Sequence, residues 1–161
     1  TPHIVTVVQV SGGKYMLLET ITEKDVQLGL SAGDWEEAVR KAAEPLRAAG
    51  AVEQSYIEGI VQSVHDNGPY FVLTKGFALA HARPECGANR LALNFSTFDP
   101  PVTFGAGAND PVRLIITLAA TDPDSHIDLL GELADVLMDE SRMEKMFRAE
   151  TPEEFLEALG R

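Results

Sequence analysis

Apolar side chains recur at every third or fourth position through much of the first half of the chain. Asp34 followed three positions later by Glu37 is a capping-box pattern, which predicts that a helix begins there. Pro45 lies inside this helix and is expected to weaken or kink it, because proline has no N–H to donate. A second helix is predicted over residues 55–67, and the pair should form an α-hairpin. The apolar stripe of the first helix comprises Trp35, Ala38, Val39, Ala42, Leu46 and Ala49.

The middle of the chain changes period and predicts strands. Short apolar segments are separated there by clusters of Gly, Pro, Asn and Asp, which favour turns. The last of these segments is apolar on both faces over its whole length, a pattern typical of a central strand covered by helices on both sides. The four predicted strands are YFVLT (70–74), FALAH (77–81), RLALNF (90–95) and RLIITLAA (113–120).

Helical spacing returns after residue 123 and continues to the C-terminus. Ser141 with Glu144, and Thr151 with Glu154, are two further capping-box patterns, so two short helices are expected at the end of the chain. With helices first, strands in the middle and helices last, we predict a three-layer α/β/α fold with a mixed central sheet. The apolar stripe of the helix after residue 123 comprises Ile127, Leu130, Leu133, Ala134 and Leu137.

The first 15 residues differ from the rest of the 161-residue chain. Residues 3–10 are rich in β-branched side chains and end at a Ser-Gly-Gly turn, so they predict a strand followed by a flexible turn. We interpret residues 1–15 as an added sheet strand, the end of a preceding domain or an expression remnant. Residues 16–161 are expected to form one domain, because this length supports a single hydrophobic core.

Composition argues against several classes of function. The chain has 13 Lys and Arg against 25 Asp and Glu, a net charge of −12, which disfavours nucleic acid and anionic membranes as partners. Its one cysteine, Cys86, excludes an internal disulfide and a cysteine-based zinc site. The sequence shows no membrane-spanning run, signal peptide or nucleotide-binding glycine motif. We therefore expect a cytoplasmic protein that uses no nucleotide.

His81 is the first candidate for chemistry. Strand alternation places Phe77, Leu79 and His81 on one face and Ala80 on the other, with His81 at the end of the strand where a loop begins. Reactive groups of α/β sheets are presented at such ends, and the small side chains of Ala80 and Ala82 leave room for another molecule. Position alone leaves three alternatives open: a packed core histidine, a metal ligand or a nucleophile.

Histidine is suited to accepting a phosphoryl group. Its ordinary pKa of about 6.5 leaves a large neutral fraction near neutral pH, and a neutral ring nitrogen can attack phosphorus. Positive or N–H donors would stabilise the charge on the transferred oxygens, and Arg83 is a candidate donor. The alternative for Arg83 is a surface ion pair with Glu85.

The other histidines are weighed by their surroundings. His126, next to Ser125, lies near the start of a predicted helix, where N–H groups can bind an anion; the alternative is that the neighbouring polar residues only cap the helix. His65 is expected to be a solvated partner of a helix C-terminus, and His3 lies in the uncertain N-terminal segment. Two histidines without an obvious third ligand are a weak metal signal, so no metal or other cofactor is expected.

Two segments carry a family resemblance. GPYFVLTKGFALAHARPE (68–85) and NDPVRLIITLAATDPDSH (109–126) resemble the enzyme IIA components of the bacterial sugar phosphotransferase system, mannitol/fructose type, and within it the ascorbate-type branch. The resemblance covers roughly residues 16–161 and implies the three-layer fold of that family. It implies that His81 accepts a phosphoryl group from the carrier HPr and passes it to a cysteine of an enzyme IIB protein. It also implies that His126 supports this group, and that a membrane component IIC selects the sugar.

The sequence departs from the family pattern beside His81. Ala80 stands where proline usually precedes the active histidine, and Ala82 stands where glycine often follows it. Without proline the backbone φ angle at this position is less constrained, which bears on the rate and specificity of transfer.

The alternative to a role in sugar uptake is a regulatory module of the same fold, in which phosphorylation of His81 changes the affinity for a partner protein.

Overall fold

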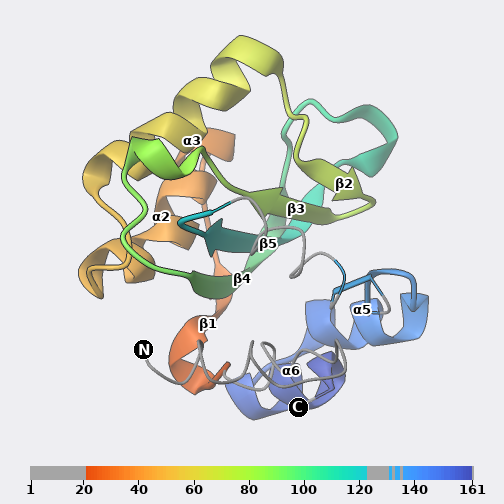
Figure 1. Cartoon of the computed structure of the whole chain (residues 1–161). Coiled ribbons are helices and arrows are strands. Elements are labelled where there is room, and N and C mark those ends of the chain that lie inside the picture. Colours follow the sequence, from red (N-terminus) through yellow and green to blue (C-terminus); the bar gives the residue numbers. More distant parts are fainter. Residues whose placement is uncertain (1–20, 123–130, 132, 135, 161) are drawn as a thin grey trace.

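The computed structural model describes residues 21–122, 131, 133–134 and 136–160, and its centre is a five-stranded sheet with the order β1-β4-β5-β3-β2 (Figure 1). β4 and β5 are antiparallel, whereas β1 runs parallel to β4 and β3 runs parallel to β5, so the sheet is mixed as predicted. The strands are β1 (Val26–Leu30), β2 (Val72–Thr74), β3 (Phe77–Ala80), β4 (Ala92–Val102) and β5 (Val112–Ala119).

Helices cover both faces of the sheet. Figure 1 shows α2 (Trp35–Ala48) and α3 (Gln54–Asn67) on one side and α5 (Glu140–Arg148) and α6 (Pro152–Leu159) on the other. Two separate clusters of buried apolar side chains fill the two interfaces between helices and sheet. The predicted three-layer α/β/α fold is therefore confirmed. Among the described residues there are also three short 3-10 helices: Glu23–Asp25, Pro84–Cys86 and Gly107–Asn109.

β5 is the central strand, as its apolar pattern predicts. Leu114, Ile115 and Ile116 are all fully buried. Ile115 belongs to the cluster under α2 and α3, while its two neighbours belong to the cluster under α5 and α6. Successive side chains of a strand point to opposite faces, so a strand covered on both sides must be apolar throughout.

β1 was not predicted, and β4 is longer than the predicted strand 90–95. β1 lies at one edge of the sheet, and only Val26 of its five residues is buried, so the segment lacks a clear alternating pattern. Gly29 has a φ of +66°, and the pairing with β4 shifts between Gln27 and Leu30. An irregular edge strand of this kind gives a weak local signal.

Helix starts followed the predicted caps in two of three cases. The Asp34 side chain accepts a hydrogen bond from the Glu37 N–H at 2.9 Å. The Thr151 box is complete, with both reciprocal hydrogen bonds formed. The predicted cap at Ser141 is wrong: Asp139 is the N-cap of α5 and accepts from the Arg142 N–H at 3.1 Å. An aspartate two positions earlier provides the better acceptor, because its carboxylate also carries charge favourable to a helix N-terminus.

α2 continues through Pro45 with a replacement for the lost hydrogen bond. The missing N–H would have bonded the carbonyl of Lys41, four residues earlier. That carbonyl instead accepts from Gln27 Nε2 on β1 at 3.2 Å. The buried stripe of α2 differs from the prediction at its end, since Ala49 is the exposed C-cap and Ala43 is buried in its place.

The predicted helix after residue 123 is described only in part. Residues 131, 133, 134, 136 and 137 are helical, and Leu133 is fully buried as predicted. Ala134 is exposed, and Val136 is buried in its place. Ile127 and Leu130, like the predicted strand 3–10, lie outside the described residues.

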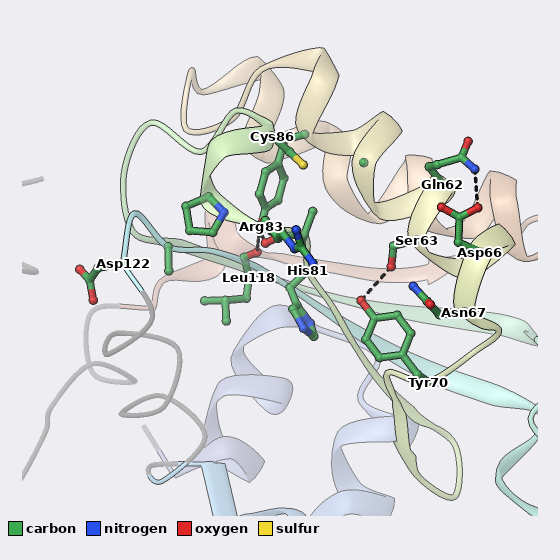
Figure 2. A pocket seen from close by; sticks show the side chains of 15 residues that line it. Gln62, Ser63, Asp66, Asn67, Tyr70, His81, Arg83, Cys86, Leu118 and Asp122 are labelled. Atoms are coloured by element: carbon green, nitrogen blue, oxygen red, sulfur yellow. Dashed lines mark hydrogen bonds between the residues drawn. The ribbon is translucent and has the colours of Figure 1, made fainter.

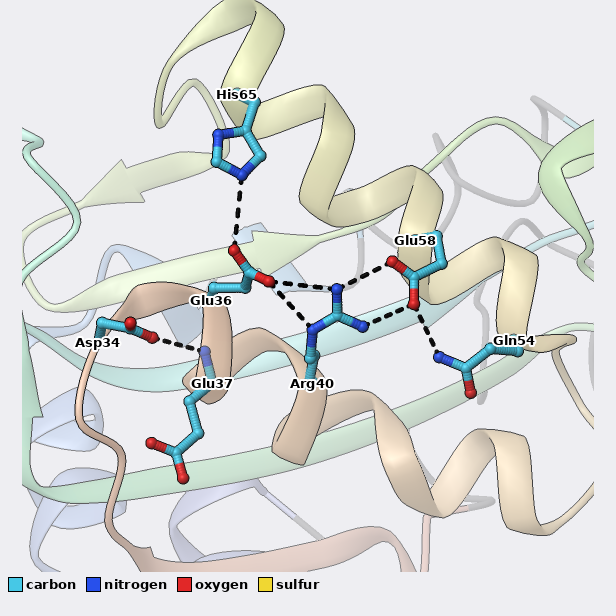
Figure 3. A network of polar contacts seen from close by, with 7 residues as sticks. All are labelled: Asp34, Glu36, Glu37, Arg40, Gln54, Glu58 and His65. Atoms are coloured by element: carbon cyan, nitrogen blue, oxygen red, sulfur yellow. Dashed lines mark hydrogen bonds and ion pairs between the residues drawn. The ribbon is translucent and has the colours of Figure 1, made fainter.

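A network of ion pairs joins the two helices of the predicted α-hairpin (Figure 3). The guanidinium of Arg40 on α2 donates two hydrogen bonds to Glu58 on α3, at 2.7 and 2.9 Å, and lies 3.2 Å from Glu36. Hydrogen bonding to Arg40 lowers the pKa of Glu58 to about 2. His65 near the end of α3 lies 3.5 Å from Glu36 and is more than half exposed, as expected for a solvated histidine.

Candidate functional site

An open pocket of about 860 Å³ lies between α3, the segment that follows β3 and the end of β5 (Figure 2). It brings together residues from three distant parts of the sequence. The α3 side supplies Tyr56, Gly59, Gln62, Ser63, Asp66 and Asn67, and the other walls include Tyr70, His81, Ala82, Arg83, Cys86, Leu118 and Asp122.

His81 is the first residue after β3, at the strand end predicted from the sequence. Its Nδ1 atom lies 2.9 Å from the carbonyl oxygen of Leu79. A carbonyl oxygen only accepts hydrogen bonds, so Nδ1 must carry the proton of the neutral ring. Nε2 therefore holds the lone pair, which makes it the nucleophilic atom of His81.

The His81 ring is half-buried against two aromatic rings. The ring of Tyr70 meets it edge-on with centroids 5.9 Å apart, and Phe71 lies at 6.1 Å. Phe77 and Leu79 share the core cluster under α5 and α6, while Ala80 belongs to the other, as the alternation predicts. Because His81 keeps partial exposure and lines an open pocket, the packed core interpretation does not fit it.

Burial lowers the pKa of His81 below its ordinary value, since imidazolium loses hydration there; the hydrogen bond to Leu79 acts in the opposite direction and is the smaller effect. We expect the ring to titrate below about 6.5. The unfolded chain binds this proton more readily than the folded protein does. The contribution of His81 to the free energy of unfolding is therefore fully present above the pKa of the unfolded chain, and it is lost as the pH falls through the pKa of the folded protein. An NMR titration of the His81 ring checks this, and a midpoint at or above the ordinary value would contradict it.

The segment after His81 is fixed to α3. Ser55 Oγ donates to the carbonyl of Cys86 at 2.5 Å, and the N–H of Ala82 donates to the Tyr56 hydroxyl at 3.1 Å. Ala82 lines the pocket as expected. Ala80 does not open the site, because it is fully buried in the core.

Arg83 and Cys86 also line the pocket. Arg83 is exposed, and the described part of the chain shows no ion pair between Arg83 and Glu85. The Cys86 sulfur lies against α3 at Gly59, where an added Cβ would come within 3.0 Å of it. Gly59 thus allows the close approach of the loop to the helix.

Asp122, just beyond the end of β5, completes the pocket wall. The next residues in the chain include Ser125 and His126, which lie outside the described residues, as does His3. Their predicted roles stay predictions. Within the described ranges, no group of three or more His, Cys, Asp or Glu side chains is placed to hold a metal ion.

Sequence reasoning missed the contribution of α3. Gly59, Gln62, Ser63 and Asp66 follow the helical spacing i, i+3, i+4 and i+7, so they form one small and polar face. Ser63 donates to the Tyr70 hydroxyl at 2.8 Å, and Gln62 donates to Asp66 at 2.9 Å (Figure 2). A polar face of this kind on a predicted helix resembles any solvated face, and only the pocket distinguishes it.

Fold and site together define a three-layer α/β protein that presents a half-buried histidine at an open pocket. Residues 19–161 match the family described as phosphoenolpyruvate-dependent sugar phosphotransferase system, EIIA 2, and the chain belongs to this family. The predicted membership in the mannitol/fructose-type enzyme IIA group is therefore confirmed, and with it a place among the phosphotransferase components.

Relatives named as mannitol-specific and as ascorbate-specific components align with most of the chain. The mannitol-specific cryptic phosphotransferase enzyme IIA component of Escherichia coli K12 is 32% identical over 145 residues, 90% of this chain and 98% of that protein. The ascorbate-specific PTS system EIIA component of Escherichia coli K12 is 33% identical over 139 residues, 86% of this chain and 90% of that protein.

A solved complex shares the fold. Enzyme IIAMtl, in its complex with phosphorylated enzyme IIBMtl from Escherichia coli, has a TM-score of 0.78 and 29% identity to this chain, covering 88% of this chain and 98% of that one. In the described part of the protein, no helix has both the length and the apolar character needed to cross a membrane.

Proposed function

We propose that the protein is a phosphocarrier in which His81 Nε2 accepts a phosphoryl group from phosphorylated HPr and passes it to a cysteine of an enzyme IIB partner. The observation that carries this proposal is the hydrogen bond between His81 Nδ1 and the Leu79 carbonyl, at a pocket open to a partner. This bond fixes the tautomer whose lone pair is on Nε2. Family membership and the relative that forms a complex with phosphorylated enzyme IIB support the same role.

Each transfer step is a displacement at phosphorus. The His81 Nε2 lone pair forms the new P–N bond while the P–N bond of the HPr phosphohistidine breaks, and the HPr ring leaves neutral. In the second step a cysteine thiolate of enzyme IIB forms a P–S bond and His81 leaves with its lone pair restored. Nδ1 keeps its proton throughout, because the Leu79 carbonyl holds it, so the two steps need no cofactor.

Donors around the pocket would stabilise the phosphoryl oxygens. Arg83 lines the pocket and supplies a guanidinium, whose planar set of N–H donors matches the oxygens of a phosphoryl group. His126 is proposed on the resemblance as the second histidine that supports the phosphoryl group. Ser125, its neighbour near the start of the predicted helix, is proposed as a weaker contributor. HPr and enzyme IIB are the proposed protein partners, with association to a membrane component IIC and no nucleic acid.

Coupled uptake of an ascorbate-like sugar is the proposed physiological role. The GPYFV and HARPE segments and the similarity to the ascorbate-specific component support this class. Substrate choice would belong to the membrane component, since no step of the relay brings the sugar to His81. The cytoplasm is the proposed location, because HPr is the donor.

Intact-protein mass spectrometry tests the carrier role. The protein is incubated with phosphoenolpyruvate, enzyme I and HPr, and then with an enzyme IIB protein. We expect one acid-labile phosphoryl group in the first reaction and its loss to enzyme IIB in the second. A protein that stays unmodified beside a phosphorylated HPr would overturn the proposal.

A further inference from the structure

Tyr56, in the first turn of α3, is buried beneath the pocket with 1% of its surface exposed. Its hydroxyl donates to the carbonyl of Leu118 on β5 at 2.7 Å and accepts from the N–H of Ala82 at 3.1 Å. The Ala82 carbonyl lies at 3.2 Å, a longer contact for the single hydroxyl proton. The phenol oxygen therefore connects the residue after His81 to the end of β5.

The position of this oxygen follows from the strand register. β3 and β5 pair in parallel from Phe77 opposite Leu114 to Ala80 opposite Thr117, and the pairing stops there although β5 continues to Ala119. In a parallel pair of strands, the hydrogen bond that would follow the pair Ala80–Thr117 runs from the Ala82 N–H to the Leu118 carbonyl. Tyr56 bonds to both of these groups, so its hydroxyl replaces the next hydrogen bond of the ladder.

This replacement fixes the backbone on both sides of His81. Ala80 is held by the last pair of the ladder, and Ala82 is held by Tyr56. The same hydroxyl anchors the end of β5 at Leu118, four positions before Asp122 in the pocket wall. Desolvation by burial raises the pKa of Tyr56 to about 12, so the hydroxyl stays a donor at neutral pH.

We propose that Tyr56 is a positioning residue for phosphoryl transfer: by bridging Ala82 and Leu118, its hydroxyl sets the backbone at His81 and thereby the direction of the Nε2 lone pair. The inference rests on the proposed function of His81. The Tyr56 hydroxyl bonds backbone groups of Ala82 and Leu118, so it acts on the geometry of attack rather than on binding of the partner.

The test compares Tyr56→Phe, which keeps the ring and removes only the hydroxyl, with Thr117→Val as a matched control. Thr117 is also fully buried and lies on β5, and its hydroxyl has no hydrogen-bond partner among the described residues. We expect Tyr56→Phe to lower kcat for phosphoryl acceptance from HPr by about tenfold with KM unchanged, the size of effect produced by losing one or two net hydrogen bonds. Thr117→Val should leave both constants within about twofold of wild type.

Nitrogen NMR of the His81 ring separates this inference from the carrier proposal. Wild-type His81 should show protonated Nδ1, and Tyr56→Phe should shift the ring nitrogen resonances and the Ala82 amide whether or not any phosphoryl group is transferred. In the wild type the Ala82 amide should exchange slowly with solvent because of its bond to Tyr56. An unprotected Ala82 amide overturns the inference even if Tyr56→Phe fails to fold. A Tyr56→Phe protein with unchanged kcat and ring spectrum, or with an effect on KM alone, also overturns it.

Discussion

Replacing His81 with alanine is expected to reduce phosphoryl acceptance from HPr below detection, by a factor of at least about 1,000, because the nucleophile of the acceptance step is removed. The readout is the fraction of protein that carries an acid-labile phosphoryl group in intact-protein mass spectra. The fold should persist, since the ring is half-buried at a pocket rather than enclosed in either core cluster.

His65→Ala provides the matched control. His65 is a histidine on the surface of α3 that contacts Glu36 and Trp35 and does not line the pocket. The phosphorylation yield of the His65→Ala protein should equal that of the wild type. Phosphorylated His81→Ala protein would show that another residue is the acceptor.

His126→Ala should still accept the phosphoryl group but hold it less well, with a lower yield or a shorter lifetime of the phosphorylated protein. An unchanged lifetime would remove His126 from the mechanism.

Phe155→Ala is expected to lower the free energy of unfolding by about 3–5 kcal/mol, the range for truncating a buried phenylalanine. Phe155 on α6 is fully buried and meets Phe95 of β4 edge-on, with ring centroids 5.4 Å apart. Urea unfolding followed by circular dichroism measures the change. The loss combines the transfer free energy of the ring with the cavity that it leaves, because β4 cannot move away from its neighbours in the sheet.

The neighbouring substitution Leu156→Ala serves as the control. Leu156 lies in the same helix but is only partly buried, so its truncation should cost clearly less than that of Phe155. Below the unfolding transition, Phe155→Ala should still be phosphorylated at His81, because α6 covers the opposite face of the sheet from α3 and its pocket residues (Figure 1). A change below about 1 kcal/mol would show that α6 is not packed as described.

Ala80 illustrates how the structure changes the meaning of a sequence departure. Proline in this position would fix the backbone φ angle before the active histidine, and alanine does not. In this protein Ala80 is instead paired with Thr117 in the sheet, and Ala82 is bonded to Tyr56. Pairing of Ala80 with β5 and the Tyr56 bridge to Ala82 therefore constrain the backbone on both sides of His81, where a proline ring would otherwise constrain it.

Local patterns were sufficient for most of the elements. The periodicity of α2 and α3, the capping box of α6 and the two-sided apolar pattern of β5 each depend on residues a few positions apart, so the sequence alone predicts them. His81 could be identified as a candidate for the same reason, since it stands at the end of a strand pattern before a loop. The resemblance then distinguished among its possible roles and favoured a supporting role for His126, which its place near a predicted helix start had already made a candidate.

The remaining features depend on contacts between distant parts of the chain. β1 is a strand because it pairs with β4, nearly seventy positions away, and its own residues carry little strand signal. The bond from Tyr56 to Leu118 spans 62 positions, and the polar face of α3 becomes a pocket wall only when the segment after β3 packs beside it. The sequence by itself thus determined the helices, the central strand and the candidate histidine, because short-range spacing encodes them. Only the tertiary structure decided the edge strand, the tautomer of His81 and the residues around it, because register and packing bring those groups together.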